Sequence, residues 1–95
     1  MERAYHAWRM RIFFTPRFER SFNGLTPELQ QLARIKIDLF RENPFSSTLH
    51  SHKLSHSELW AFSVDNKNRV IFKFQKDAEA LLINVGDHSI YRKIG

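Results

Sequence analysis

The sequence predicts a single α+β domain in which two helices cover one face of a twisted, mainly antiparallel four-stranded sheet. Residues 60–85 contain three runs in which apolar and mixed side chains alternate, as they do on strands with one buried face. Residues 27–43 instead carry apolar side chains at helical spacing. The order strand, two helices and three strands builds one domain around one core, and we assign it to residues 10–95.

The three C-terminal runs are predicted to form an antiparallel meander. The loops at residues 65–68 and 75–79 are short and polar, which suits hairpins. The predicted core face carries Trp60, Phe62, Val64, Val70, Phe72, Phe74, Leu81, Ile83 and Val85. The predicted open face carries Ser63, Arg69, Lys73 and Asn84. Since a sheet that packs on helices needs only one apolar face, the open face is available for binding.

The N-terminal part is predicted to hold an extension, a strand and a short helix. Residues 1–9 form the extension, and apolar side chains alternate over residues 10–14 as in a strand. Thr15 can cap the free amides of a helix, and Pro16 at its first position loses no hydrogen bond. Asn23-Gly24 is the expected end of this helix.

A longer helix is predicted to follow. Thr26-Pro27-Glu28 repeats the start signal, with an acidic residue near the positive end of the helix. Pro44 disfavours helix before it, so the helix should stop at Asn43. Its buried stripe is predicted to consist of Leu29, Leu32, Ala33, Ile35, Leu39 and Phe40.

The connections suggest how the elements meet. The first strand is expected beside the last strand and parallel to it, because parallel neighbours are normally joined through a helical crossover. Residues 44–58 are predicted to be a loop rich in Ser and His, and the tail after His88 to form a short helix or strand. This topology brings the loop, the strand of Arg69 and the corner at residues 86–91 toward one another.

Composition narrows the function classes. The chain has 95 residues, no cysteine and a formal net charge of +5, so disulfides and Cys-based metal sites are excluded. The positive charge favours nucleic acid or an acidic protein as partner. No run approaches the roughly 20 apolar residues of a membrane helix, and the start lacks a secretory-signal pattern. We therefore expect a cytoplasmic protein with no membrane partner.

Residues 52–92 resemble a known family. The segments HKLSHSELWAFSVDNKNRVIFKF and LLINVGDHSIYR are similar to the C-terminal half of the RelE/ParE superfamily of type II toxin–antitoxin toxins, closest to its RelE and YafQ-like branch. The resemblance implies an endoribonuclease that cuts mRNA, typically on the ribosome, by attack of the ribose 2′-OH on the adjacent phosphate. It also implies an antitoxin partner, and neither a metal nor a small-molecule cofactor.

The resemblance assigns roles to particular positions. Arg69 falls where the family carries a strand arginine that grips phosphate, and His88 falls on its Gly-x-His corner, where imidazole acts as acid or base. Ser63 and Lys67 stand where the YafQ branch carries a His and an Asp, which leaves the general base open between His50 and His52. The predicted catalytic residues are Arg69, His88, His52 and Tyr91, and the predicted RNA-binding residues are His50, Lys53, Lys73 and Arg11.

Other interpretations of the same residues stay open. His50, His52 and His56 are equally explained as exposed loop residues, and their spacing also permits a zinc site, although no acidic or Cys ligand is clearly placed beside them. Two other functions also remain. One is a ParE-like toxin that inhibits DNA gyrase through a protein surface, and the other is a degenerate toxin that only binds its antitoxin. In each case the expected partner is an acidic antitoxin that lays a helix or strand on the basic sheet face or on the helical hairpin.

Overall fold

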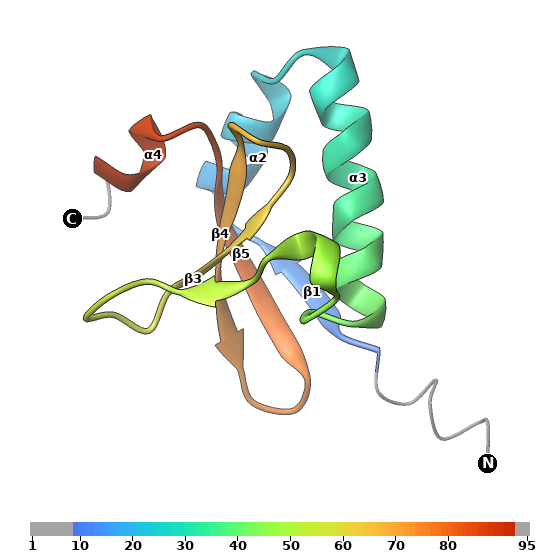
Figure 1. The fold of residues 1–95 in the computed structure, drawn as a ribbon, viewed down its shortest axis with the longest axis vertical. Coiled ribbons are helices and arrows are strands. Elements are labelled where there is room, and N and C mark those ends of the chain that lie inside the picture. The colour runs from blue at the N-terminus through green and yellow to red at the C-terminus, as the bar shows by residue number, and fades with distance from the viewer. Residues whose placement is uncertain (1–8, 93–95) are drawn as a thin grey trace.

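The structure is a computed structural model and describes residues 9–92. Figure 1 shows the helical pair α2 and α3 beside the sheet, with α4 on the side away from α3. The predicted extension, residues 1–9, lies outside the described residues except for Arg9. In chain order the elements are β1 (Arg11–Phe14), α2 (Pro16–Asn23), α3 (Pro27–Glu42), the 3-10 helix η1 (Ser47–Leu49), β2 (His52–Lys53), β3 (Trp60–Ser63), β4 (Arg69–Gln75), β5 (Glu79–Gly86) and α4 (Ser89–Arg92).

The sheet has the order β1-β5-β4-β3-β2. The β3-β4-β5 meander and the parallel pairing of β1 with β5 confirm the predicted α+β topology. The predicted number of four strands is wrong, because His52 and Lys53 pair with Ala61 and Trp60 as a fifth strand. This two-residue strand has no alternating apolar run and is held by backbone pairing, so the side-chain pattern does not reveal it.

Both predicted helix starts are confirmed by their caps. The hydroxyl of Thr15 accepts a hydrogen bond from the N–H of Phe18 at 3.0 Å, and that of Thr26 accepts one from Leu29 at 3.2 Å. Each cap satisfies one of the amides that the first helical turn leaves free. The longer helix ends as expected, because Asn43 is extended and Pro44 follows it.

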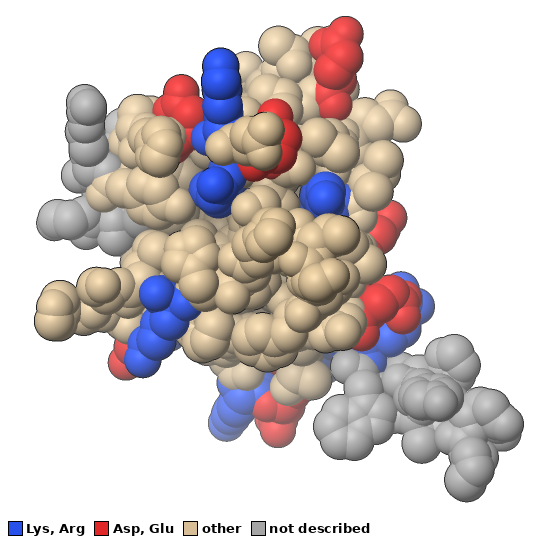
Figure 2. Space-filling view, viewed as in Figure 1, with Lys and Arg blue, Asp and Glu red and all other residues tan. Residues whose placement is uncertain are grey.

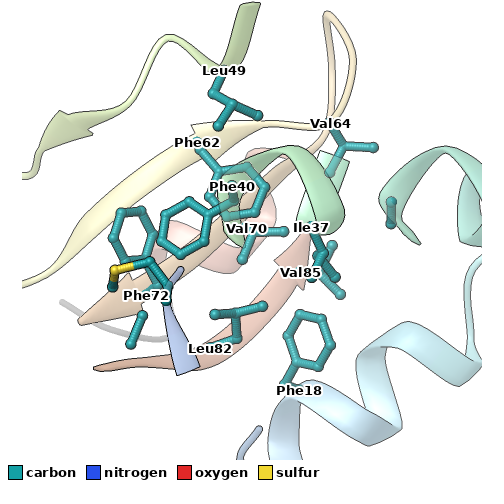
Figure 3. Close-up of a cluster of buried hydrophobic side chains, with 13 residues drawn as sticks. Phe18, Ile37, Phe40, Leu49, Phe62, Val64, Val70, Phe72, Leu82 and Val85 are labelled. Carbon is teal, nitrogen blue, oxygen red and sulfur yellow. The ribbon is translucent and has the colours of Figure 1, made fainter. Parts of the chain in front are cut away.

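The aromatic ring of Phe40 lies at the centre of the core (Figure 3). It stacks on Phe62 with ring centroids 4.8 Å apart and meets Phe72 edge to face at 4.7 Å. All three rings are fully buried. These contacts hold α3 against β3 and β4, and aromatic pairs of this geometry add to the stability gained from burial alone.

One member of the predicted helical stripe is wrong. Ile35 is 54% exposed, whereas Ile37 is buried. The positions that face the sheet are Ala33, Ile37 and Phe40, which follow the i, i+4, i+7 spacing of one helix face. Ile35 lies about 200° around the helix from Ile37 and so points to the other side.

The predicted phase of the last strand is also wrong over its first half. Ile71 pairs with Asn84 but Phe72 pairs with Leu82, so β5 contains one extra residue, Ile83, at a bulge. The core side of β5 therefore carries Ala80 and Leu82 before the bulge and Val85 after it. A bulge shifts the two-residue alternation by one position, and a strand that is apolar on both faces gives no sign of the shift.

The second face of the sheet is less open than predicted. Ala61 and Ile71, which face away from the main core, are fully buried. Asn84, predicted on the open face, is only 3% exposed, and its side-chain oxygen accepts a 2.6 Å hydrogen bond from the hydroxyl of Ser21 in α2. Asn84 therefore ties the bulge to α2 and is not available for a ligand.

Replacing Phe40 by alanine tests the central packing. The Phe40→Ala variant should lower the free energy of unfolding by about 3–5 kcal/mol, because it removes a buried ring and leaves a cavity. Urea unfolding followed by circular dichroism measures the loss. Ile35→Ala, on the exposed side of the same helix, is the matched control and should change stability by no more than about 0.5 kcal/mol. Equal effects of the two substitutions would contradict this account of the core.

Candidate functional site

A hollow of about 390 Å³ opens beside the β3–β4 loop. Figure 1 shows that loop, η1 and the middle of α3 around this place. The lining of the hollow combines cationic and imidazole side chains with hydroxyl and amide groups. This combination suits an anionic ligand that also forms hydrogen bonds. The lining residues are Lys36, Thr48, His50, His52, Ser63, Val64, Asp65, Asn66 and Arg69.

Arg69 lies at the start of β4, half-buried between Ser63 of β3 and Gly86 of β5. Its Nη1 donates hydrogen bonds to the backbone carbonyls of Asp65 at 2.7 Å and Asn68 at 3.1 Å. Arg69 thus closes the hairpin loop through one nitrogen. In the described part of the chain its Nε and Nη2 make no hydrogen bond, so that edge of the guanidinium can donate to an oxyanion.

Asp65 is the one carboxylate in this lining, and the turn already uses its charge. One oxygen accepts hydrogen bonds from the N–H groups of Lys67 and Asn68 and from the side chain of Asn68. Partial desolvation raises the pKa of Asp65, but these hydrogen bonds and the charge of Arg69 outweigh it, so that the pKa is lowered from its ordinary value. The carboxylate therefore stays ionised and organises the loop.

His50 and His52 come from the segment between η1 and β2. His50 ends η1 in the left-handed conformation, with φ 50° and ψ 42°. The Nδ1 atom of His52 lies 3.0 Å from the carbonyl oxygen of His50. Both side chains are exposed, so a ligand in the hollow can reach them.

The other predicted RNA-binding cations lie apart from the hollow. Lys53 is in register with Trp60 and so points to the opposite side of the sheet from its neighbour His52. Lys73 is paired with Glu58 at 3.3 Å, and Arg11, on the far edge of the sheet, is paired with Glu79. On the face shown in Figure 2, Lys and Arg side chains are scattered among Asp and Glu and form no single basic patch.

His88 and Tyr91 form a second group at the C-terminal corner. Their ring centroids are 6.2 Å apart, and neither residue lines the hollow. Asp87 accepts hydrogen bonds from the N–H and hydroxyl of Ser89, and these lower the pKa of its carboxyl group. The corner begins at Gly86, the direct partner of Arg69, so it lies on the β5 side of that arginine.

Gly86 allows α4 to pack closely on the end of the sheet. A Cβ atom at this position would lie 2.7 Å from Cγ2 of the buried Ile90. The glycine is therefore required by a close approach, not by an unusual backbone angle. This packing sets the position of the short helix that carries Tyr91.

The sequence did not predict Lys36, Thr48, Val64, Asp65 or Asn66 as part of the site. Lys36 comes from α3, and Thr48 from η1. Lys36 lies next to the buried Ile37 on a helix with many charged residues, so nothing in its local sequence distinguishes it. Its proximity to His50 depends on how α3 packs on the sheet.

A separate apolar groove of about 480 Å³ runs between α2 and α3. Phe14, Phe18, Phe22 and Ile37 provide its apolar surface, and Phe14 is 41% exposed. The remaining lining residues are Glu19, Asn23, Arg34, Asp38 and Arg41. An apolar floor with charged residues of both signs at its rim suits one side of an amphipathic helix.

Two kinds of feature are absent from residues 9–92. No helix in this part of the chain is long and apolar enough to cross a membrane. Nor, within the same residues, do three His, Asp or Glu side chains come together in a way that could hold a metal ion.

The charge of Asp65 should make the loop beside the hollow sensitive to acid. Asp65→Asn keeps an acceptor oxygen but removes the charge, so the variant should be less stable at pH 7 by about 1 kcal/mol or less. Because the folded pKa is lowered, the advantage of the wild type is complete above about pH 4–5 and disappears as the pH falls through the folded pKa, below about 3.9. Urea unfolding of both proteins at several pH values measures this difference. A difference that stays constant down to pH 2.5 would contradict the account.

Comparison with known proteins gives matches to solved structures alone. No protein-family model and no curated protein sequence matches the chain. The YoeB/ParE toxin from Agrobacterium tumefaciens superposes with a TM-score of 0.72 at 12% identity, covering 83% of this chain and 99% of that one. The RelE–RelB complex from Pyrococcus horikoshii gives 0.71 at 14% identity, covering 83% and 94%.

The DinJ–YafQ toxin–antitoxin complex of E. coli is similar to the same degree. It matches with a TM-score of 0.71 at 14% identity, over 86% of this chain and 96% of that one. Nearly the whole of each solved chain is thus covered by the described domain. The resemblance seen in residues 52–92 is confirmed at the level of the fold, and the chain has the RelE-like fold of the RelE/ParE superfamily toxins.

Proposed function

We propose that this protein is the toxin of a type II toxin–antitoxin system. We propose further that it acts in the cytoplasm as a metal-independent endoribonuclease that cleaves mRNA on the ribosome. The observation that carries the proposal is the hollow in which Arg69, His50 and His52 meet, with Lys36 at its border. Its volume lies within the range of small-ligand sites, and its cations and imidazoles match the needs of phosphodiester cleavage.

The chemistry needs an acid and a base on opposite sides of the phosphorus. The base removes the 2′-OH proton, the 2′ oxygen attacks phosphorus, and the bond to the 5′ oxygen breaks as an acid protonates it. In the sheet order, β4 with Arg69 lies between the β2 side, where His52 is, and the β5 side, which leads to His88. We propose that Arg69 stabilises the negative charge of the phosphorane, that His52 or His50 acts as the base, and that His88 acts as the acid.

The remaining roles are peripheral. Tyr91, next to His88, would orient or stack on the nucleotide, and Lys36 would attract the phosphate. Lys53 and Lys73 would contact the RNA backbone at a distance from the reacting atoms, and Arg11 lies on the opposite edge of the sheet. Lys73 would have to exchange its Glu58 partner for RNA, and an exposed ion pair of this kind is worth little enough to allow it.

A gyrase-directed, ParE-like activity is the second candidate. One observation favours it: one of the similar structures is described as a YoeB/ParE toxin. In addition, the carboxylate partners of Arg11 and Lys73 make these two cations less available to RNA. In that case the hollow would be part of a protein-binding surface. A degenerate toxin that only binds its antitoxin would neither cleave RNA nor inhibit gyrase.

The antitoxin is the proposed protein partner, and the groove between α2 and α3 is the proposed place for one of its helices. Two of the similar structures are toxin complexes with RelB and DinJ. The groove provides apolar contact area, and the chain's net charge of +5 favours an acidic partner.

Substitutions of Arg69 and His88 test the nuclease proposal. After induction in a bacterial host, Arg69→Ala should reduce transcript cleavage by about 100- to 1,000-fold, the effect of removing one donor to a developing oxyanion. His88→Ala should reduce it by about 100-fold or more. Primer extension maps the cuts, and growth reports toxicity. Lys76→Ala, an exposed cation in the β4–β5 turn, is the control and should cleave normally.

The same experiment separates the candidate functions. Because Arg69 also bonds the hairpin carbonyls, melting temperatures must show that its variant is folded, and Arg69→Lys adds a variant that keeps the charge. Full cleavage by folded Arg69→Ala and His88→Ala would reject the site. Arrested replication with intact transcripts would select the ParE-like activity, and no effect on growth would select the degenerate toxin.

Two neighbouring residues of this protein test whether the antitoxin binds in the groove between α2 and α3. Phe13 and Phe14 are neighbours on β1 with similar exposure, 46% and 41%, but they point to opposite faces of the sheet. Phe14→Asp should weaken binding of the cognate antitoxin by about 2 kcal/mol or more, because it places a charge in the groove. Phe13→Asp should bind normally. Isothermal titration measures both, and similar losses would argue against the groove.

A further inference from the structure

The backbone of His50 and the ring of His52 are joined in a way that determines where the ring proton lies. Nδ1 of His52 is 3.0 Å from the carbonyl oxygen of His50. A carbonyl oxygen can only accept a hydrogen bond, so Nδ1 must carry the hydrogen. A neutral imidazole has one N–H, and the lone pair is therefore on Nε2.

The short segment that makes this contact is fixed at several points. Leu49 is fully buried in the core, and the hydroxyl of Ser51 donates a 2.6 Å hydrogen bond to the carbonyl of Pro44. His52 itself is paired with Ala61 in the sheet. An exposed histidine side chain is thus carried on a backbone that is anchored on both sides.

The conformation of His50 allows the chain to turn between these anchors. Its φ of 50° and ψ of 42° lie in the left-handed region, which few residues with a side chain adopt. The turn directs the His50 carbonyl toward the ring two residues later. Uncommon backbone conformations of this kind are concentrated at functional sites, where the surrounding structure holds them.

We infer that Nε2 of His52 is the general base of the proposed cleavage, and that the backbone carbonyl of His50 is the group that positions it. This inference rests on the proposed nuclease function and removes the ambiguity between the two histidines. Nε2 takes the 2′-OH proton, the 2′ oxygen bonds to phosphorus, and the 5′ oxygen leaves with a proton from a separate acid. The imidazolium formed still donates from Nδ1 to the His50 carbonyl, which stabilises its charge.

The competing assignment is the side chain of His50. Within residues 9–92, no hydrogen bond to the ring of His50 is recorded, so nothing fixes its tautomer or its orientation. The inference therefore requires the backbone of His50 and not its imidazole. This distinction makes the two histidines separable by substitution.

The first test reads the tautomer directly and needs no activity. Long-range ¹H–¹⁵N spectra of the purified, ¹⁵N-labelled protein above the titration of its histidines distinguish the two neutral forms of each ring. His52→Asn assigns the signals by their disappearance. The expected result is an Nδ1–H ring at His52, whereas a histidine side chain in water favours Nε2–H. An Nε2–H ring at His52 would overturn the positioning role of the His50 carbonyl.

The second test uses cleavage of transcripts by folded variants. His52→Asn should lose about 100-fold or more of the activity, since a general base is removed while an N–H group remains for the carbonyl. His50→Gly should keep the His52 tautomer and lose much less activity than His52→Asn, because glycine readily adopts the left-handed conformation and so keeps the carbonyl in place. His50→Ala should be slower than His50→Gly, because alanine disfavours that conformation.

The outcomes separate this inference from the function on which it rests. Loss of activity in His50→Gly with full activity in His52→Asn would overturn it in favour of the His50 side chain. If the wild-type protein and Arg69→Ala both leave RNA intact, the nuclease function fails and the base assignment fails with it. The tautomer spectrum would still decide the contact between the His50 carbonyl and the His52 ring.

Discussion

The packing of Phe40 against Phe62 and Phe72 is the contact on which the rest of the molecule depends. It joins the last turn of α3 to β3 and β4, and all three rings are fully buried. Interiors are packed too closely for such a contact to shift by much. Once α3 is held there, its charged residues have fixed places: Lys36 borders the hollow, and Arg34 and Arg41 border the groove. Both candidate surfaces are therefore set by one hydrophobic contact.

The two surfaces differ in physical character. The hollow beside the β3–β4 loop is polar, cationic and ordered by hydrogen bonds through Asp65 and Arg69. The groove between α2 and α3 is lined by three phenylalanines and an isoleucine. A small anionic group is best bound by directed donors, and a protein segment by apolar area. The division suits a protein that carries out a reaction at one place and is held by a partner at another.

Arg69 has two roles that a single substitution removes together. Its Nη1 closes the hairpin loop, and the residue lines the hollow. The loop is thereby held in place by the same side chain that is proposed to bind phosphate. Lysine carries the charge but lacks the planar fork, so it cannot make both sets of contacts in the same geometry. The left-handed turn at His50 has a similar double effect, because it ends η1 and aims a carbonyl at His52.

Local patterns in the sequence were sufficient for the element order and most boundaries. Thr15 and Thr26 cap their helices because a cap needs only the neighbouring amides. Alternation over residues 60–74 determined which face of β3 and β4 packs on the main core, since all the aromatic side chains there lie on one face, although Ala61 and Ile71 on the other face are buried as well. The parallel place of β1 beside β5 followed from the helical connection between them. The family resemblance pointed to Arg69, His52 and His88, and the predicted topology brought all three toward one another, whereas the hollow contains Arg69 and His52 but not His88.

Only the tertiary structure decided features that depend on distant partners. The bulge at Ile83 shifts the phase of β5, and the apolar residues on both of its faces conceal that shift. Ile37 is buried and Ile35 exposed because the sheet lies on one side of α3, and β2 exists because β3 offers it a pairing edge. The hollow collects Lys36, His52 and Arg69 from three separate segments, and leaves His88 on the other side of β4. The sequence alone thus determined which elements form, because caps and alternation act over a few residues, whereas the site was decided by packing between residues far apart in the chain.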